Sequence, residues 1–388
     1  MTIFEKTPAL RWAVPAVTAV ALVGGGSALS GLHAIADAGL PARSAAQLLV
    51  DVQQARLDGL SGTVVQKSDL GLPSLPGMGG SGGMASSNLT SLISGTHTMR
   101  VWFAGPDKAR MALLGTLGES DVIRHGNDVW VWASQGKTAK HYLLPAHVAG
   151  KSKPTAGMPG PAGVPTSPQA AADKALAAIS PSTEVTTSGT ATVAGRPAYE
   201  LVLKPKEATS LVAQVRIAID GARHVPVRVQ VFAKSVSDPV FEVGFSAVDF
   251  ARPDAAQFAF NPPPGTAVTE GKVATGKQAV TGSKSGTVAP QSKSADMPTV
   301  MGKGWGSVVV VKMPAPSAQT GSASTGATTD KTVAQLMKYV GMLPKVSGSW
   351  GSGHLMAGSV FSALLTDDGR LVVGAVTPKG LYAALAAR

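Results

Sequence analysis

The sequence predicts an α+β protein, in which a long antiparallel β-sheet packs with a few helices and a small C-terminal unit follows. Runs of alternating apolar and polar residues recur between residues 96 and 260, and turn-forming residues separate them. Two other stretches carry apolar residues at helical spacing. Aromatic residues make up only 5% of the 388 residues, while Gly (45) and Pro (27) are abundant, which favours many short elements over a helical bundle.

The N-terminal residues predict export from the cytoplasm. Residues 12–32 contain no charge, are about long enough to span a bilayer, and follow two basic residues. The small-x-small pattern at residues 34–36 is typical of a signal-peptide cleavage site. Residues 1–36 are therefore predicted to be a signal peptide or an N-terminal membrane anchor. Both alternatives place the rest of the chain in an extracytoplasmic location, secreted or anchored to the cytoplasmic membrane.

A helix and a strand are predicted next. Ser44 is suited to cap the helix, and Gly59 to end it. The apolar residues on one helical face are Ala45, Leu48, Leu49, Val52 and Ala55. A strand over residues 61–67 follows, and then a Gly/Pro/Ser-rich flexible insert near residues 68–95.

Five short strands are predicted between residues 96 and 144, because turn residues interrupt the apolar runs at short intervals. A second flexible insert is expected near residues 145–167. The stretch 167–180 predicts a helix, since Ser167 can cap it and Pro168 suits its first position.

Longer strands are predicted from residue 184 to residue 260. Apolar residues alternate with polar ones such as Arg216, Arg228 and Glu242, which indicates an antiparallel sheet with one apolar face. The apolar sets are Val215, Ile217 and Ile219; Val225, Val227, Val229 and Val231; and Phe241, Val243, Phe245 and Ala247. Phe258 and Phe260 predict a last short strand, which the prolines at 262–264 would end.

The domain boundaries follow from these changes in composition. Residues 37–268 are predicted to form the main domain, residues 269–303 a lysine-rich flexible linker, and residues 304–388 a small C-terminal unit. Within that unit we expect helices over residues 329–343 and 381–388. Asp368-Gly369 between two apolar runs predicts a hairpin, with Asp367 and Asp368 as turn residues and not as a catalytic or metal-binding pair.

No motif points to catalysis. The sequence has no cysteine, which excludes disulfides, thiol nucleophiles and thiolate metal sites, and it has no G-x-S-x-G motif. Residues 271–278 match a phosphate-binding loop except that Gln278 replaces the hydroxyl residue. The seven histidines lack metal-ligand spacing. We therefore expect no enzyme, no cofactor and no metal.

The net charge of +11 does not indicate a nucleic-acid partner, because no basic patch is interleaved with aromatic residues. The apolar strand faces leave two alternatives open. They can close on the helices as a dry core, or they can line a cavity for a lipid or acyl chain. The candidate lining residues are Leu48, Leu49, Val52, Val101, Phe103, Trp130, Trp132, Val215, Ile217, Ile219, Val227, Val229, Val231, Phe241, Val243 and Phe245.

Three segments resemble the LolA/LppX/RseB superfamily of exported lipid- and lipoprotein-handling proteins. They are the helix that runs into the strand at residues 48–66, the strand series of residues 200–232, and the F-x-F-x-P-P-x-G pattern of residues 258–265, which here has an extra proline. The resemblance covers roughly residues 40–270. The C-terminal part looks like an extension found with such domains in high-GC bacteria.

The resemblance implies a strongly curved antiparallel sheet, a half-open barrel wrapped around helices, whose apolar cavity holds acyl chains. The expected function is thus non-catalytic binding or carriage of lipid or lipoprotein acyl chains. The alternative is an RseB-like sensor that contacts a membrane anti-sigma factor, so a membrane protein is the second kind of partner expected. A structural envelope protein with a filled core is a third hypothesis.

Overall fold

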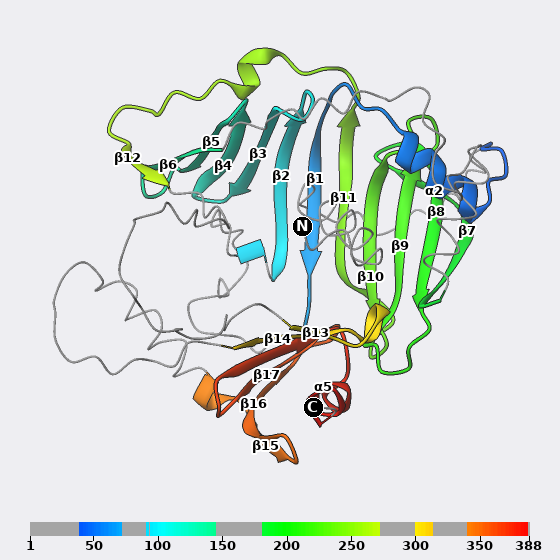
Figure 1. Cartoon of the computed structure of the whole chain (residues 1–388). Helices are drawn as coiled ribbons and strands as arrows, with labels where there is room; N and C mark the ends of the chain where they lie inside the picture. The colour runs from blue at the N-terminus through cyan, green and yellow to red at the C-terminus, as the bar shows by residue number, and fades with distance from the viewer. Residues whose placement is uncertain are drawn as a thin grey trace, which may run out of the picture.

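The structure is a computed structural model, and it describes residues 39–71, 91–92, 94–144, 181–271, 299–312 and 340–386. In these residues two β-sheets dominate: one of twelve strands and one of six. Figure 1 shows the large sheet as a curved wall, with the small sheet lying across one end of its strands. The antiparallel sheets predicted from the sequence are present, and the large one is not closed into a barrel.

The large sheet has the order β12-β6-β5-β4-β3-β2-β1-β11-β10-β9-β8-β7. Its strands confirm the predicted hairpin series. They are β1 (Leu60–Ser68), β2 (Gly95–Phe103), β3 (Lys108–Gly115), β4 (Gly118–His125), β5 (Asp128–Ala133), β6 (Thr138–Leu143), β7 (Thr183–Val193), β8 (Arg196–Pro205), β9 (Val212–Asp220), β10 (Pro226–Ala233), β11 (Pro239–Asp249) and β12 (Ala267–Gly271).

The sheet consists of two meanders that meet at one seam. Strands β1 to β6 and strands β7 to β11 each pair with their neighbours in the chain, and β1 pairs with β11 to join them. A bulge at Ser246 shifts the register of this seam, so that Ala247 faces Thr63 while Phe245 faces Val64. The prediction that Ala247 shares a face with Phe245 is therefore wrong.

Helix α2 (Ala45–Gln54) confirms the first predicted helix, although it ends before Gly59. Ser44 and Gln47 form a capping box: the Ser44 hydroxyl accepts from the Gln47 amide at 3.2 Å, and Gln47 Oε1 accepts from the Ser44 amide at 2.9 Å. The helix buries Leu48 against Tyr199, Leu201 and Ile219 of the large sheet. This contact fixes α2 over the β8–β9 end of the sheet.

The predicted strand at Phe258 and Phe260 is wrong. Residues 255–258 form the 3₁₀ helix η3 (Ala255–Phe258), capped by Asp254, whose side chain accepts from the Ala256 amide at 2.8 Å. The prolines do not end the sheet, because the chain crosses from the central strand β11 to the β6 edge and adds β12, which pairs in parallel with β6. Figure 1 shows this crossing segment, residues 250–266, running past the upper ends of the strands from β11 towards β12.

The crossing segment packs through its two phenylalanines. The Phe258 side chain is only 1% exposed. The Phe260 ring lies 5.3 Å from the Trp130 ring and 6.2 Å from the Trp132 ring, measured between centroids. The alternation of Phe258 and Phe260 thus serves packing on one face of the sheet, and β12 extends three residues beyond the predicted domain boundary at residue 268.

The small sheet has the order β13-β14-β18-β17-β16-β15 and is antiparallel throughout. Helix α5 (Pro378–Ala386) packs on it and confirms the C-terminal helix, which starts earlier than predicted. The strands are β13 (Thr299–Met301), β14 (Val308–Lys312), β15 (Lys345–Gly348), β16 (Gly351–Ala357), β17 (Ser362–Thr366) and β18 (Arg370–Gly374), with the 3₁₀ helix η4 (Gly304–Gly306) between β13 and β14.

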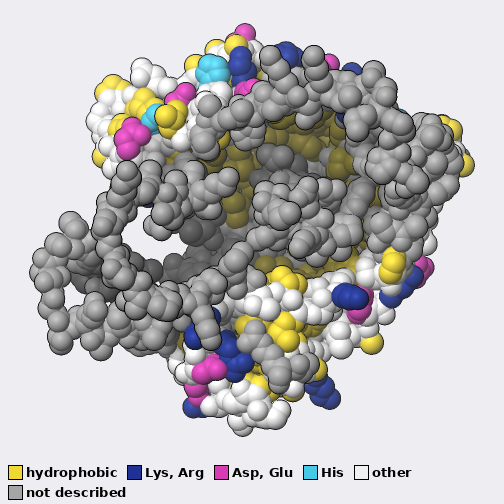
Figure 2. Space-filling model, in the orientation of Figure 1, with side chains coloured by type: hydrophobic (Ala, Val, Ile, Leu, Met, Phe, Trp, Pro, Cys, Tyr) yellow, Lys and Arg dark blue, Asp and Glu magenta, His cyan; other side chains and the backbone are white. Residues whose placement is uncertain are grey.

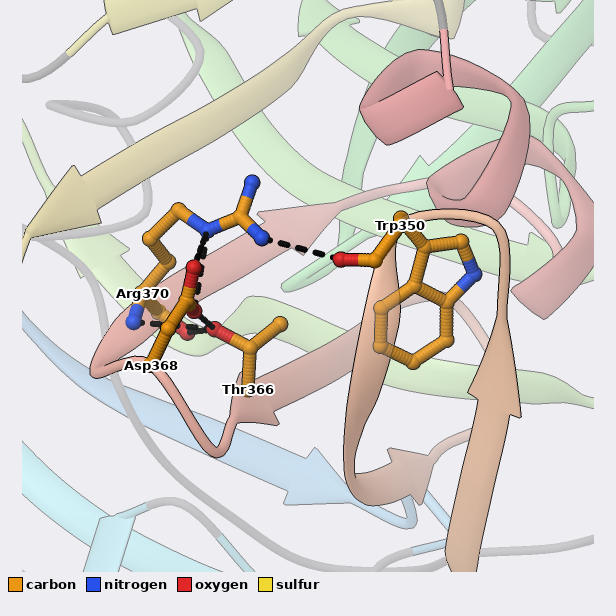
Figure 3. A network of polar contacts seen from close by, with 4 residues as sticks. All are labelled: Trp350, Thr366, Asp368 and Arg370. Carbon is orange, nitrogen blue, oxygen red and sulfur yellow. Dashed lines mark hydrogen bonds and ion pairs between the residues drawn. The ribbon is translucent and has the colours of Figure 1, made fainter.

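The predicted hairpin at Asp368-Gly369 joins β17 to β18. Gly369 has a φ of 82°, which glycine adopts without strain. Asp368 accepts from the Arg370 guanidinium with Nε and Oδ2 2.7 Å apart, and Arg370 Nη2 donates to the Trp350 carbonyl at 3.1 Å (Figure 3). These contacts confirm Asp368 as a turn residue.

Backbone hydrogen bonds connect the two sheets. The loop before β9 pairs with the chain after β18: the Leu211 amide donates to the Ala375 carbonyl and the Thr377 amide to the Thr209 carbonyl, each at 2.9 Å. On the other side, the Ser359 amide donates to the Leu70 carbonyl, just after β1, at 2.7 Å. The small sheet is therefore attached to both halves of the large one.

Several expectations fall wholly or mostly outside the described residues. They are the export segment (1–36), most of each flexible insert, the helix over 167–180, most of the helix over 329–343 and the interior of the linker. Of the stretch assigned to the linker, both ends are strands: β12 ends at Gly271 and β13 starts at Thr299. Among the described residues no helix is long and apolar enough to cross a membrane.

Candidate functional site

The candidate lining residues on β9 to β11 form two rows across one face of the sheet. In the first row Ile217 lies opposite Val229, which lies opposite Val243. In the second row Val215, Val231 and Phe241 are aligned in the same way. Val227, Val229, Val243 and Phe245 are buried, while Val215, Ile217, Val231 and Phe241 are half-buried. The register thus brings eight of the candidates onto one surface, here called the apolar face.

The first helix and two candidates on β2 belong to the same surface. Leu48, Leu49 and Val52 pack with Ile219 and Ile217 where α2 crosses β8 and β9. On the other side of the seam, Val101 joins the cluster that contains Val64 and Phe245, and Phe103 lies opposite Leu60 of that cluster. Figure 2 shows hydrophobic side chains lining the hollow beside the two sheets wherever the described surface is visible.

Trp130 and Trp132 do not join the other candidates. Trp130 lies opposite Ile123, which lies opposite Arg110, which in turn lies opposite Trp102. Trp102 follows Val101 in β2 and so points to the other face. The two tryptophans therefore face the crossing segment, where Phe260 packs against them. This separation leaves fourteen of the sixteen candidates on the apolar face.

The opposite face is polar over β8 to β11, as the alternation predicts. Arg216 Nη1 lies 3.7 Å from Glu200 Oε1, and Gln230 donates to Glu242 at 2.9 Å. These partners keep the charged groups satisfied at the buried position of Glu200 and the half-buried positions of Arg216 and Glu242. The large sheet is therefore two-sided in this half, with polar groups on one side and aliphatic rows on the other.

On β3 and β4 that same side holds a buried ion pair. Arg110 Nη2 lies 2.5 Å from Asp121 Oδ2, whose side chain is 1% exposed, and 3.7 Å from Glu119 Oε1. Burial and the neighbouring Glu119 raise the pKa of Asp121 to about 7, and the positive charge of Arg110 acts against this rise. The Arg110 guanidinium also lies 5.2 Å from the Trp102 ring centroid. The register places these groups on the same face as Trp130 and Trp132.

At the β12 edge, His141 joins three strands. Its Nε2 lies 2.8 Å from Asp128 Oδ1 and its Nδ1 3.1 Å from Glu270 Oε2, and its ring stacks on Trp130 at 4.4 Å. The hydrogen bond with Asp128, followed by that with Glu270, raises the pKa of His141. No group of three or more His, Cys, Asp or Glu side chains in the described ranges is arranged to hold a metal ion.

Polar residues on the apolar face were missed by the sequence reasoning. Gln66 and Ser68 of β1 and His97 of β2 are 4 to 7% exposed and lie on the same face of these strands as Val64 and Met99. The signal was present, because Gln66 and Ser68 occupy the apolar positions of the β1 alternation. The predicted strand ended at residue 67, and the polar side chains were not assigned to a face.

No protein-family model and no curated protein matches the sequence. Among solved structures, a MucA/MucB complex from Pseudomonas aeruginosa matches at a TM-score of 0.40 and 15% identity, over 88% of this chain and 96% of that chain. A LolA superfamily protein from Nitrosomonas europaea matches at a TM-score of 0.21 and 11% identity, over 56% of this chain and 99% of that chain. A putative outer membrane lipoprotein-sorting protein domain from Vibrio parahaemolyticus matches at a TM-score of 0.22 and 10% identity, over 55% of this chain and 95% of that chain.

At identities of 10 to 15% and TM-scores of 0.40 or less, these structures say nothing about what this chain binds. One of the matching structures is a LolA superfamily protein, and another contains MucB.

Proposed function

We propose that this protein binds lipid or lipoprotein acyl chains on the apolar face, outside the cytoplasm and without catalysis. The observation that carries the proposal is the width of that face. The seven strands from β2 to β7 in sheet order extend over roughly 30 Å at about 4.8 Å per strand. Helix α2 has ten residues, about 15 Å in length, and packs at the β8–β9 end. Among the described helices, α2 is the one that packs on the apolar face, since η3 packs at β3 and β4 in the segment that faces Trp130 and Trp132.

The energetics favour an apolar ligand. Each methylene removed from water contributes about 0.8 kcal/mol, so ten buried methylenes contribute roughly 8 kcal/mol before the cost of ordering the chain. The half-buried side chains Val215, Ile217 and Phe241 are the ones that such a chain would cover further. No charged group is required for this binding, which agrees with the aliphatic character of the two rows.

The test is lipid retention. The fragment from Asp37 onward, purified without detergent, should carry extractable lipid that mass spectrometry identifies. Phe241→Ser should lose most of it, because Phe241 lies on the apolar face. Glu242→Ser is the matched control, since Glu242 is the next residue of β11, is equally half-buried and lies on the polar face. A wild-type fragment without lipid and without affinity for acyl probes would refute the proposal.

A sensor that contacts a membrane protein is the alternative, and the second sheet favours it. The small sheet is attached to both halves of the large one, so a partner bound there could respond to the state of the apolar face. Pull-down from membranes with the full chain and with a chain lacking residues 300–388 separates the two proposals. A pure carrier loses no protein partner on this deletion, whereas the sensor loses its partner.

A further inference from the structure

A polar group interrupts the apolar face where β1 and β2 approach the second sheet. Gln66 lies directly opposite His97, and their side chains are 5% and 4% exposed. The next residues on the same face of β1 and β2 are the fully buried Val64 and Met99. Four residues beyond Gln66, the Leu70 carbonyl accepts the hydrogen bond from the Ser359 amide in the loop between β16 and β17. Because Gln66 also lies opposite Val243, the polar group ends the first row, Ile217, Val229 and Val243, on its β1 and β2 side.

The hydrogen bonds of His97 determine which ring nitrogen carries the proton. His97 Nε2 lies 2.9 Å from the Ser94 carbonyl oxygen. A carbonyl only accepts, so Nε2 donates, and in the neutral ring Nδ1 is left as a bare acceptor. Gln66 Nε2 donates one hydrogen to the Leu92 carbonyl at 2.6 Å, and no hydrogen bond joins the Gln66 side chain to His97 Nδ1.

His97 Nδ1 is buried and has no hydrogen-bond partner in the part of the chain that the structure describes. Buried acceptors of this kind are rare, and each costs on the order of 1–3 kcal/mol when nothing donates to it. For the neutral ring the missing partner is a donor, because Nδ1 then offers only a lone pair. A hydroxyl group can donate to it, whereas an anionic oxygen meets the lone pair of the neutral ring and is repelled.

We propose that His97 Nδ1 accepts a hydrogen bond from a hydroxyl group on the polar end of the bound amphiphile. The inference rests on the proposed function and specifies its ligand class: an acyl chain with an uncharged, hydroxyl-bearing end, such as a glycerol or sugar alcohol. The hydroxyl lies at the end of β1 and β2 next to the small sheet. The chain extends from there along the apolar face, where the nine residues of β1 span about 30 Å.

The experiment compares two probes that differ in one hydrogen-bond donor. Radiolabelled oleyl alcohol and oleyl methyl ether have the same chain, but only the alcohol donates. Each is incubated with the full chain, immobilised on resin and rinsed free of detergent, and the retained label is counted. We expect the wild-type protein to prefer the alcohol about tenfold, the effect of one buried hydrogen bond of roughly 1.4 kcal/mol.

Two variants at His97 separate the roles of its nitrogens. His97→Gln places an amide near the Nε2 position, keeps the donor to the Ser94 carbonyl and removes the Nδ1 acceptor, so the preference should fall to about one. His97→Asn places an amide oxygen near the Nδ1 position and should keep the preference. The ¹⁵N resonance of wild-type Nδ1 should shift with the alcohol and not with the ether.

The outcomes are distinct. Equal retention of both probes by the wild-type protein refutes the hydroxyl site, as expected if a bound water satisfies Nδ1, and leaves the proposed function standing. Retention of neither probe refutes both. Because this comparison is made within the wild-type protein, it decides the question even if a His97 variant fails to fold.

Discussion

Truncation of Phe258 to alanine should destabilise the large sheet more than any single change in the rest of the crossing segment. The Phe258 side chain is 1% exposed and packs in η3 over the sheet. Removing a fully buried phenylalanine costs about 3–5 kcal/mol, since the lost transfer energy adds to the cost of the cavity. For a domain of this size, each kcal/mol lowers the melting temperature by about 2–4 °C, so we expect a fall of roughly 10 °C.

Thermal unfolding followed by circular dichroism measures this change, and near-ultraviolet signals report on Trp130 and Trp132 beneath the segment. Phe260→Ala should have an intermediate effect, because its ring is half-buried and contacts the two tryptophans at 5.3 and 6.2 Å. Leu117→Ala is the matched control, since Leu117 is 75% exposed. If Phe258→Ala lowers the melting temperature no more than Leu117→Ala does, the crossing segment does not pack on the sheet as described here.

Three further predictions concern pH and the joint between the sheets. The pKa of Asp121 is raised from 3.8 to about 7, so the neutral carboxyl stabilises the fold fully below pH 3.8. This contribution, about 4 kcal/mol, is lost as the pH rises through 7. In urea unfolding, the difference in free energy of unfolding between the wild type and Asp121→Asn should change between pH 4 and 8, and a constant difference would contradict this prediction. His141 also has a raised pKa, so its ion pair with Glu270 is fully present below pH 6.5 and weakens as the pH rises through the raised pKa. The protection of the amides of residues 267–271 from hydrogen exchange should therefore fall with rising pH in the wild type, and it should not depend on pH in this way in His141→Gln. Gly304→Ala should weaken the joint between the sheets, because a Cβ at Gly304, whose φ is 57°, would lie 2.5 Å from the Ser182 Cβ just before β7. Limited proteolysis should then cut between the sheets faster, and an unchanged rate would count against this contact.

Local signals predicted most of the elements. Turn residues such as Gly126 and Asp368 lie between strands that pair next to each other, and Ser44 with Gln47 starts a helix by a local capping box. Alternation predicted the rows on β9 to β11, because those strands follow one another and their turns fix the register.

The elements that could not be predicted depend on pairing between parts of the chain that are far apart in the sequence. Alternation in β5 shows that Trp130 and Val129 face opposite sides, but only the register through β3 and β4 shows which side holds Val101. The Phe258–Phe260 pattern has the period of a strand, yet Asp254 and the tryptophan surfaces fix it as a 3₁₀ turn. The parallel pairing of β12 depends on a contact across 129 residues between His141 and Glu270, which no local pattern encodes.

The seam between β1 and β11 has a consequence for the order of folding. Each meander can form from neighbours in the chain, but Ser61 pairs with Asp249, so the seam closes only after a long loop has been brought together. Until then both meanders expose an unpaired strand at what becomes the centre of the sheet. We therefore expect the seam to be the slow step, and the period before it closes to be the one in which the chain is most prone to aggregate.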